Sequence, residues 1–337
     1  MRQTLRQVLG AASAGVARLT LATESRLRPS PPLSILVYHR VTAKPEAIYP
    51  DGIEAAKFDQ LMRRVAAHFR VLSLGQAAHC LAEGRLPGRA LVLTFDDGYA
   101  DNAELAMPIL QRHGLVGTFF VASGFLDGGC MWNDRIIHSL RTTRRECIDL
   151  TPLGLGRVAV RTVGERESAI EAVIQRIKYS PLDQRERKLD ELARATAVTD
   201  HPRNLMMRSD QVTALQSGGM EVGGHTVNHP ILTELDESQA AHEISAGRRH
   251  LQSLTNAPVD VFAYPNGKPG RDYGQRDARL VREAGFRAAV STAQGVAHAG
   301  DPLFELPRYS PWTDPPDLWL YRVVAARSGS GFGVAPN

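Results

Sequence analysis

Two short segments combine carboxylates and imidazoles at spacings that suit metal-assisted hydrolysis. Asp96 and Asp97 follow the apolar run Ala90–Phe95. Side chains alternate in direction along a strand, so one carboxylate can bind a cation while the other faces a substrate. His225 and His229 stand four residues apart in a Gly-Gly-His-Thr-Val-Asn-His-Pro segment. A helical turn there can bring both imidazoles onto one ion.

Each segment alone also fits a simpler interpretation. Asp-Gly is a common turn pair, and two surface histidines can share this spacing by chance. A third segment, Val261–Gly267, ends an apolar run in a turn that contains Pro265. Such a turn can aim a backbone N–H at a developing oxyanion. The three segments are more specific together than separately.

Apolar runs and amphipathic periodicity indicate the elements that position these segments. We expect strands at 34–38, 90–95, 117–121, 220–223, 259–263 and 286–291. Helical spacing is present at 53–69, 102–113, 234–254 and 275–284. Nearly continuous apolar strands are typical of parallel sheets buried on both faces. The alternation predicts an α/β fold with its chemistry at the carboxyl ends of the strands.

Three regions fall outside this alternation. Residues 127–208 are rich in Arg and Glu, and we interpret them as a helical insertion on one domain (34–327), with helices at 166–177 and 183–197. Residues 1–33 form an N-terminal appendage, amphipathic or disordered. The Gly/Ser-rich tail, 328–337, is expected to be disordered.

The ordered motifs resemble those of the polysaccharide deacetylase family, the NodB homology group or carbohydrate esterase family 4. The resemblance rests on Thr94-Phe-Asp-Asp-Gly98, then His225-Thr-x-x-His229, then the proline-containing turn. Tyr38-His-Arg-Val41 and Gly285-Phe286 support it. Leu306-Pro-Arg308 is also similar to members that act in exopolysaccharide synthesis. The resemblance covers roughly residues 34–312.

The resemblance implies a distorted (β/α)7 barrel with a helical insertion. Asp97, His225 and His229 would hold the metal, Asp96 would be the catalytic base, and Asn266 would supply a backbone N–H to the oxyanion. Zn²⁺ is the first choice of ion, although a site of two histidines and one aspartate also accepts cobalt, nickel or iron.

The sequence departs from the family pattern at two places. Ala263 stands where the family often has an arginine that orients the base, and we hypothesise that Arg308 replaces it in space. The alternative is a surface Arg308 paired with Glu305. The usual late Leu-x-His acid is not evident, which leaves His39 and His298 as candidate general acids.

Aromatic residues near the motifs are candidates for sugar binding. Trp132 and Trp312 can stack on a pyranose ring, although burial in a core is the commoner fate of tryptophan. Tyr264 and Pro265 of the third segment are also expected to contact substrate.

The predicted activity is metal-dependent hydrolysis of an acetyl group on a polysaccharide, with N-acetyl amino sugars favoured. The enzyme would be a hydrolase of non-peptide C–N bonds. An O-acetyl esterase on the same scaffold and a catalytically inactive sugar-binding module are the alternatives. A phosphotransfer receiver also pairs aspartates after a strand, but the His-x-x-x-His segment and the chain length disfavour it.

The overall composition limits the kinds of binding partner that we expect. The net charge is only +4 on 337 residues, with no basic tract interleaved with aromatics, so no nucleic-acid partner is expected. Arg2 and Arg6 precede a weakly apolar run, so residues 1–25 can act as a weak export signal or touch a membrane surface. A cytoplasmic or membrane-peripheral location is favoured. The three cysteines are expected to be free thiols, and the oligomeric state stays open.

Overall fold

The computed structural model of this chain describes residues 31–48, 50, 52–310 and 316–327. The predictions for the N-terminal appendage up to residue 30, for the tail and for Trp312 fall outside the described residues. The location and membrane predictions that rest on residues 1–25 therefore stay predictions. Among the described residues, no helix combines the length and apolarity that a bilayer crossing requires.

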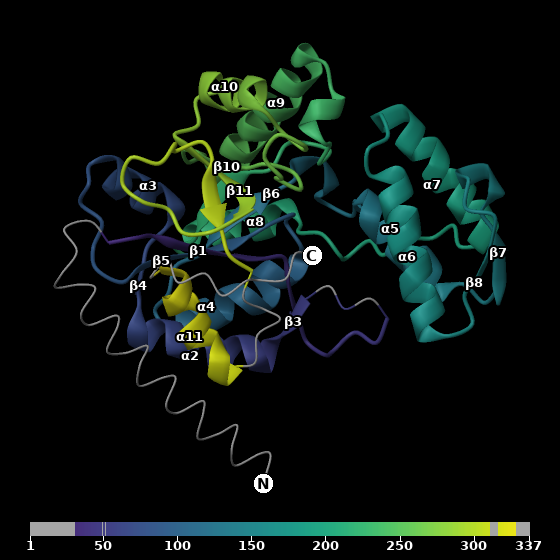
Figure 1. Cartoon of the computed structure of the whole chain (residues 1–337), viewed down its shortest axis with the longest axis horizontal. Coiled ribbons are helices and arrows are strands. Elements are labelled where there is room, and N and C mark those ends of the chain that lie inside the picture. Colours follow the sequence, from purple (N-terminus) through teal and green to yellow (C-terminus); the bar gives the residue numbers. More distant parts are fainter. Residues whose placement is uncertain (1–30, 49, 51, 311–315, 328–337) are drawn as a thin grey trace, which may run out of the picture.

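Seven parallel strands form a closed barrel (Figure 1). Around the barrel they are β1 (Ser34–Tyr38), β5 (Ala90–Phe95), β6 (Thr118–Val121), β9 (Glu221–Gly224), β10 (Val261–Ala263), β11 (Ala288–Gln294) and β12 (Leu306–Arg308). The Val37 N–H donates to Tyr309 O at 3.0 Å, and the Tyr309 N–H donates to Ile35 O at 2.8 Å, which joins β12 back to β1. A short strand, β4 (Arg70–Val71), pairs with the start of β5. The predicted distorted (β/α)7 barrel is confirmed.

Helices cover the outside of the barrel. They are α2 (Ala55–His68), α3 (Leu74–Ala82), η1 (Asn102–Ala106), α4 (Met107–Arg112), α8 (Ser209–Ser217), α9 (Glu237–Thr255), α10 (Gln275–Glu283) and α11 (Pro316–Arg327). Short 3₁₀ turns occur at η2 (Ser123–Phe125) and η4 (Leu232–Glu234), and β2 (Arg40–Thr42) pairs with β3 (Gly52–Glu54). The predicted helix at 102–113 begins with a π turn, η1. Helices α3, α8 and α11 were not predicted.

Local sequence explains where these helices begin and which face they bury. Ser73 and Gln76 form a capping box that starts α3, since each side chain accepts a hydrogen bond from the backbone N–H of the other. Helix α2 buries Phe58, Leu61 and Val65, which share one helical face, against the barrel. On the face of the barrel that packs against α2, Phe95 stacks on Phe119 with ring centroids 4.5 Å apart, and Phe58 of α2 meets Phe95 edge-on at 5.9 Å. Such contacts hold the carboxyl end of β5, which leads directly into Asp96 and Asp97.

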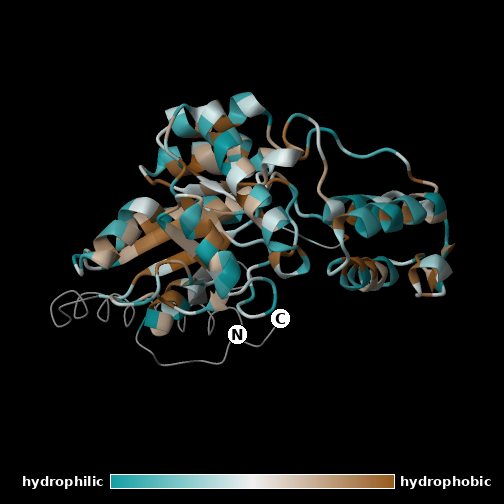
Figure 2. Ribbon diagram, turned by 90° about the horizontal axis from the view of Figure 1, so that it is seen from above, coloured by the Kyte–Doolittle hydropathy of each residue, from teal (hydrophilic) through white to brown (hydrophobic). Residues whose placement is uncertain are grey.

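The insertion folds into a separate lobe to one side of the barrel (Figures 1 and 2). This helical lobe (residues 127–208) contains α5 (Trp132–Thr142), β7 (Cys147–Asp149), η3 (Thr151–Leu153), β8 (Arg157–Ala159), α6 (Val163–Ile177) and α7 (Leu182–Thr196). The predicted helices at 166–177 and 183–197 correspond to α6 and α7. The lobe has its own core of buried apolar side chains, among them Ile136, Leu140, Ile170 and Leu189. Cys80, Cys130 and Cys147 are free thiols, as predicted.

Candidate functional site

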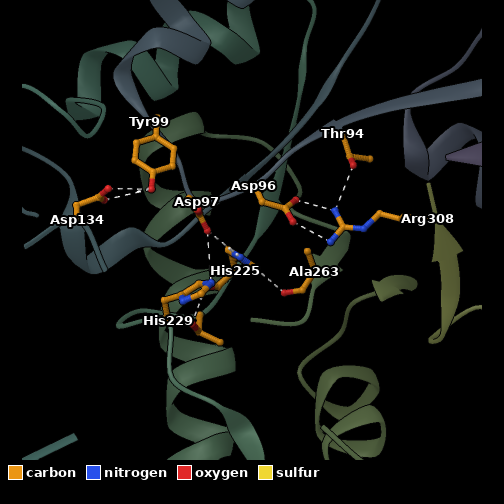
Figure 3. A network of polar contacts seen from close by, with 10 residues as sticks. Thr94, Asp96, Asp97, Tyr99, Asp134, His225, His229, Ala263 and Arg308 are labelled. Atoms are coloured by element: carbon orange, nitrogen blue, oxygen red, sulfur yellow. Dashed lines mark hydrogen bonds and ion pairs between the residues drawn. The ribbon is translucent and has the colours of Figure 1, made fainter. Parts of the chain in front are cut away.

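A strained turn at the end of β5 sends its two aspartates in different directions. Asp97 and Gly98 have φ values of +77° and +91°, a left-handed conformation that Asp and Gly tolerate better than most residues. A Cβ on Gly98 would lie 3.0 Å from Val121 Cγ1, so the close approach to β6 also favours glycine. In Figure 3 the Asp96 carboxylate points toward Arg308, and the Asp97 carboxylate points toward the two histidines.

The histidine loop after β9 is shaped by one buried glutamate. Glu243 of α9 accepts hydrogen bonds from the backbone N–H groups of Val227 and Asn228 at 2.9 and 2.8 Å. Its other oxygen accepts from the Asn228 side-chain amide at 2.7 Å. The Thr226 hydroxyl accepts from the His229 N–H at 3.1 Å. These contacts hold the sharp turn that separates the two imidazoles.

Three potential ligands converge on one point. His225 Nε2 and His229 Nε2 each lie 3.4 Å from Asp97 Oδ1, and one donor atom from each of the three residues lies within 4.8 Å of the others. The two rings are 4.7 Å apart, centre to centre. His225 Nδ1 donates to the Ala263 carbonyl at 2.7 Å (Figure 3). That hydrogen bond fixes the tautomer whose Nε2 carries a free lone pair.

The charge states suit a divalent cation. Burial lowers the pKa of His229 to about 3, so its imidazole is neutral, as a metal ligand must be. Burial tends to raise the pKa of Asp97, but the two histidine rings beside its carboxylate outweigh burial and hold the pKa below its usual range. The set therefore offers one carboxylate and two neutral nitrogens, which fits a transition-metal ion. Three protein ligands leave a coordination position for solvent or substrate.

Arg308 makes a bidentate ion pair with Asp96. Its two terminal nitrogens donate to Asp96 Oδ1 and Oδ2, each at 2.7 Å. The same guanidinium donates to the Ser291 carbonyl at 2.8 Å and to the Thr94 hydroxyl at 3.2 Å. Arg308 is fully buried, so the alternative of a surface Arg308 paired with Glu305 is wrong. The structure thus gives Asp96 a cationic partner, Arg308, in the absence of an arginine at position 263.

This ion pair determines the charge of Asp96. Burial alone would raise the pKa of the Asp96 carboxyl, because a low-dielectric interior disfavours the charged form. The charge and hydrogen bonds of Arg308 outweigh burial and hold the pKa below its usual range. Asp96 is therefore ionised and oriented near neutral pH, as a general base must be.

The structure brings one of the two candidate acids to the site. His39 follows β1 and lines the same cavity as Asp96 and Asp97. The Asn102 side chain donates to the His39 carbonyl at 2.8 Å, which anchors this segment to the turn after β5. His298 is exposed and lies outside the cavity. Ala297 beside it pairs with Leu33, at the amino ends of the strands, so the chain has turned away from the site.

Asn266 has the geometry of an oxyanion donor. Its φ is +56°, and the Thr292 hydroxyl donates to its carbonyl at 2.8 Å. Within the described part of the chain, the Asn266 N–H donates to no acceptor. The residue lines the cavity, so this N–H is available to a ligand there.

One cavity of about 410 Å³ joins these groups, a volume within the range of about 300–1,000 Å³ that small-molecule sites occupy. The barrel and the helical lobe both line it. Trp132 and Tyr264 line the cavity, but Pro265 does not. Trp132 is only 4% exposed and packs in the core of the helical lobe, the commoner fate of tryptophan. Tyr264 donates to the Phe304 carbonyl at 3.0 Å and stacks on Tyr273, so it is largely committed to packing.

Two supporting residues escaped the sequence analysis. Arg185 of the helical lobe is 3% exposed and donates to the Asn228 carbonyl at 3.1 Å. It also lies 5.4 Å above the Trp132 ring. Burial lowers the pKa of Arg185 to about 10. Glu243, described above, occupies the buried face of α9 between Ala240 and Gly247. A charged residue at a buried helical position was the signal that could have identified Glu243, whereas nothing local distinguishes Arg185.

Known proteins resemble this chain in sequence. A model of the polysaccharide deacetylase family matches residues 83–144 and 188–289. YxkH of Bacillus subtilis (strain 168), named as a polysaccharide deacetylase, is 19% identical over 304 residues, which cover 90% of this chain and 75% of that protein. The unmatched residues 145–187 between the two parts lie within the helical lobe.

Solved structures share the fold. The deacetylase PplD of Streptococcus pyogenes, in complex with acetate, matches with a TM-score of 0.57 and 18% identity over 88% of this chain and 99% of that one. A de-N-acetylase from Aggregatibacter actinomycetemcomitans matches with a TM-score of 0.54 and 16% identity over 86% and 99% of the two chains. At this level of sequence identity, the comparison with these structures shows a shared fold.

Proposed function

The chain belongs to the polysaccharide deacetylase family, and from that premise we propose that it hydrolyses N-acetyl groups on amino sugars within a polysaccharide. One observation carries the proposal. Asp97, His225 and His229 converge beside the Asp96–Arg308 ion pair in a single cavity. The predicted class of the protein, a hydrolase of the polysaccharide deacetylase type, is confirmed by the family match.

Asp97, His225 and His229 would hold the divalent ion. When bound, such an ion polarises a carbonyl oxygen and lowers the pKa of a coordinated water toward about 7. Zn²⁺ is our proposed ion, because two imidazoles and one carboxylate with an open position form a common catalytic zinc site. Cobalt, nickel and iron suit the same ligands.

The other residues of the site would transfer the protons and stabilise the negative charge that develops on the acetyl oxygen. Asp96, held ionised by Arg308, accepts a proton from the attacking water. The Asn266 N–H donates to the oxygen that becomes negative as the acetyl carbon turns tetrahedral. His39 lines the same cavity and gives a proton to the leaving amine, which completes the hydrolysis. Trp132 lines the cavity from within the core of the helical lobe and shapes this part of its wall.

Measuring acetate release tests the proposal. The zinc-loaded protein is expected to release acetate from oligomers of N-acetylglucosamine faster than from O-acetylated xylo-oligosaccharides, and chelation should stop the reaction. N-acetyl preference is supported by the de-N-acetylase among the structural neighbours. Faster release from the O-acetylated series would favour the esterase alternative, and zinc binding with no release from either would favour an inactive sugar-binding module.

Replacing Arg308 by methionine is expected to damage both stability and catalysis. Asp96 would keep its buried charge without a partner, which typically lowers the free energy of unfolding by about 3–5 kcal/mol. A base that is no longer held in place should also reduce kcat by about 100-fold, with a smaller change in KM. Denaturant unfolding and steady-state kinetics on the folded fraction measure the two effects separately.

Arg327 provides the matched control. It is also buried, and it donates to the Ser34 hydroxyl and the Ala90 carbonyl, far from Asp96 in the chain and at the opposite ends of the strands. Arg327→Met should lower stability but leave the kcat of the folded enzyme near the wild-type value. Equal kcat values for the two variants would contradict the positioning role of Arg308.

A further inference from the structure

The helical lobe contributes a lysine to the candidate active-site cavity. Lys178 follows the last turn of α6 and lines the cavity together with Ile174 and Gln175 of the same helix. Among the described residues that line the cavity, Lys178 is the one lysine or arginine. A cation at the C-terminus of a helix interacts favourably with the helix dipole. That interaction does not require the side chain to face a cavity.

The Lys178 ammonium lies 5.7 Å from the centre of the Tyr179 ring, and within the described part of the chain it has no ion-pair or hydrogen-bond partner. The nearest candidate is Asp272, which is fully buried and already accepts from the Tyr179 hydroxyl and the Lys268 N–H, each at 3.0 Å. Lys178 is half-buried, and burial lowers the pKa of its ammonium. An unpaired cation in this setting gains free energy when an anion binds beside it.

The neighbouring tyrosine holds Lys178 at the mouth of the barrel. Tyr179 donates to Asp272 of the loop after β10, and the Arg271 guanidinium lies 4.7 Å above the Tyr179 ring. These contacts tie the end of α6 to the barrel. The position of Lys178 relative to the catalytic groups is therefore fixed by contacts of its neighbour and does not depend on a flexible linker.

The carboxylates that line the cavity do not pair with Lys178. Asp96 already pairs with Arg308, and Asp97 lies against the two histidines. A divalent cation on Asp97 would make the cavity more positive. A neutral polysaccharide offers nothing to balance this charge, whereas an acidic one does.

We propose that Lys178 binds a carboxylate of the substrate, so that the enzyme acts on an acidic polysaccharide in which the acetylated amino sugar neighbours a uronic acid. This inference rests on the proposed deacetylase function and adds the substrate class. Lys178 is then a specificity residue supplied by the helical lobe, while the barrel supplies the chemistry.

Two tetrasaccharides test the inference. One alternates N-acetylglucosamine with glucuronic acid, and the other is the tetramer of N-acetylglucosamine. Lys178→Met is expected to raise KM for the acidic tetrasaccharide by about 10- to 100-fold, the usual effect of losing a hydrogen bond to a charged group. Its kcat, and KM for the neutral tetramer, should change little. Added salt should raise the wild-type KM for the acidic substrate more than that of the variant.

The controls separate specificity from folding. Lys188 lies in the same lobe and donates to the Ser180 hydroxyl outside the cavity, so Lys188→Met should match the wild type. Lys178→Arg should recover most of the affinity for the acidic substrate. Thermal unfolding checks that Lys178→Met is folded, and Lys178→Gln serves as the second test if it is not.

The outcomes distinguish this inference from the proposed function. Equal effects of Lys178→Met on both tetrasaccharides, or a wild-type preference for the neutral one, would overturn the inference and leave the deacetylase proposal standing. If neither substrate releases acetate, calorimetric binding decides. Tighter binding of the acidic tetrasaccharide to the wild type than to Lys178→Met would support the lysine subsite without the deacetylase function, and equal binding would overturn the subsite as well.

Discussion

Replacing Asp97 by alanine is expected to yield a folded protein that retains no divalent cation and releases essentially no acetate. Asp97 Oδ1 is the point on which both histidine Nε2 atoms converge, so its loss leaves two imidazoles without the anionic ligand. Polarisation by a bound ion contributes several kcal/mol to catalysis, which corresponds to a fall in kcat/KM of about 10³-fold or more. Metal content after dialysis and acetate release measure the two losses independently.

Thermal unfolding gives a third measurement that does not depend on turnover. A cation at 100 times its Kd stabilises the folded state by about 2.7 kcal/mol, so added Zn²⁺ should raise the Tm of the wild type and leave that of Asp97→Ala unchanged. Asp200 is an exposed aspartate of the helical lobe, and Asp200→Ala should behave as the wild type in all three assays. Retention of a stoichiometric ion by Asp97→Ala would contradict the assigned metal site.

Asp96→Asn is expected to lower kcat by about 10²- to 10⁴-fold while the metal content stays at the wild-type level. Asparagine keeps the shape of the side chain and can still accept one hydrogen bond from Arg308, but it cannot take up a proton from water. The variant should also be less stable, because the fully buried Arg308 loses its counter-charge. Single-turnover acetate release, metal analysis and denaturant unfolding together measure these effects.

The matched control for Asp96→Asn is a buried aspartate paired with an arginine elsewhere. Asp277 of α10 is 1% exposed and lies 2.7 Å from the Arg276 guanidinium. Asp277→Asn should lower stability and leave the kcat of the folded enzyme unchanged. If Asp96→Asn retained the wild-type kcat, Asp96 could not be the base, and another group would have to accept the proton.

The helical lobe takes part in the site as well as in the overall shape. Trp132, Asn133 and Lys178 form part of the cavity wall, and Arg185 reaches the carbonyl of Asn228 in the histidine loop. The family model leaves residues 145–187 of this lobe unmatched. Trp132 and Asn133 lie within the matched part of the lobe, whereas Lys178 lies in the unmatched part.

Local patterns predicted six of the seven barrel strands, all except β12, and the groups at the ends of β5 and β9. Ala90–Phe95 is continuously apolar and ends in two aspartates, and the predicted strand matches β5 residue for residue. The predicted strand at 259–263 was longer than β10 (Val261–Ala263). Both imidazoles of the His-x-x-x-His segment lie beside Asp97, as expected, but through a sharp turn with Thr226 and His229 at positive φ instead of a helical turn. These features are readable because each depends on the direction of side chains within one strand or one turn.

The sequence by itself thus determined the α/β alternation, the two aspartates at the end of β5 and the paired histidines, since each is encoded within short stretches of the chain, whereas the barrel was implied by the family resemblance. The tertiary structure decided which partners these groups have. Arg308 pairs with Asp96 across 212 residues because β12 closes the barrel beside β1, and His298 is excluded because its loop turns toward the opposite end of the strands. No local pattern specifies such pairings, because they depend on which strand ends meet when the barrel closes.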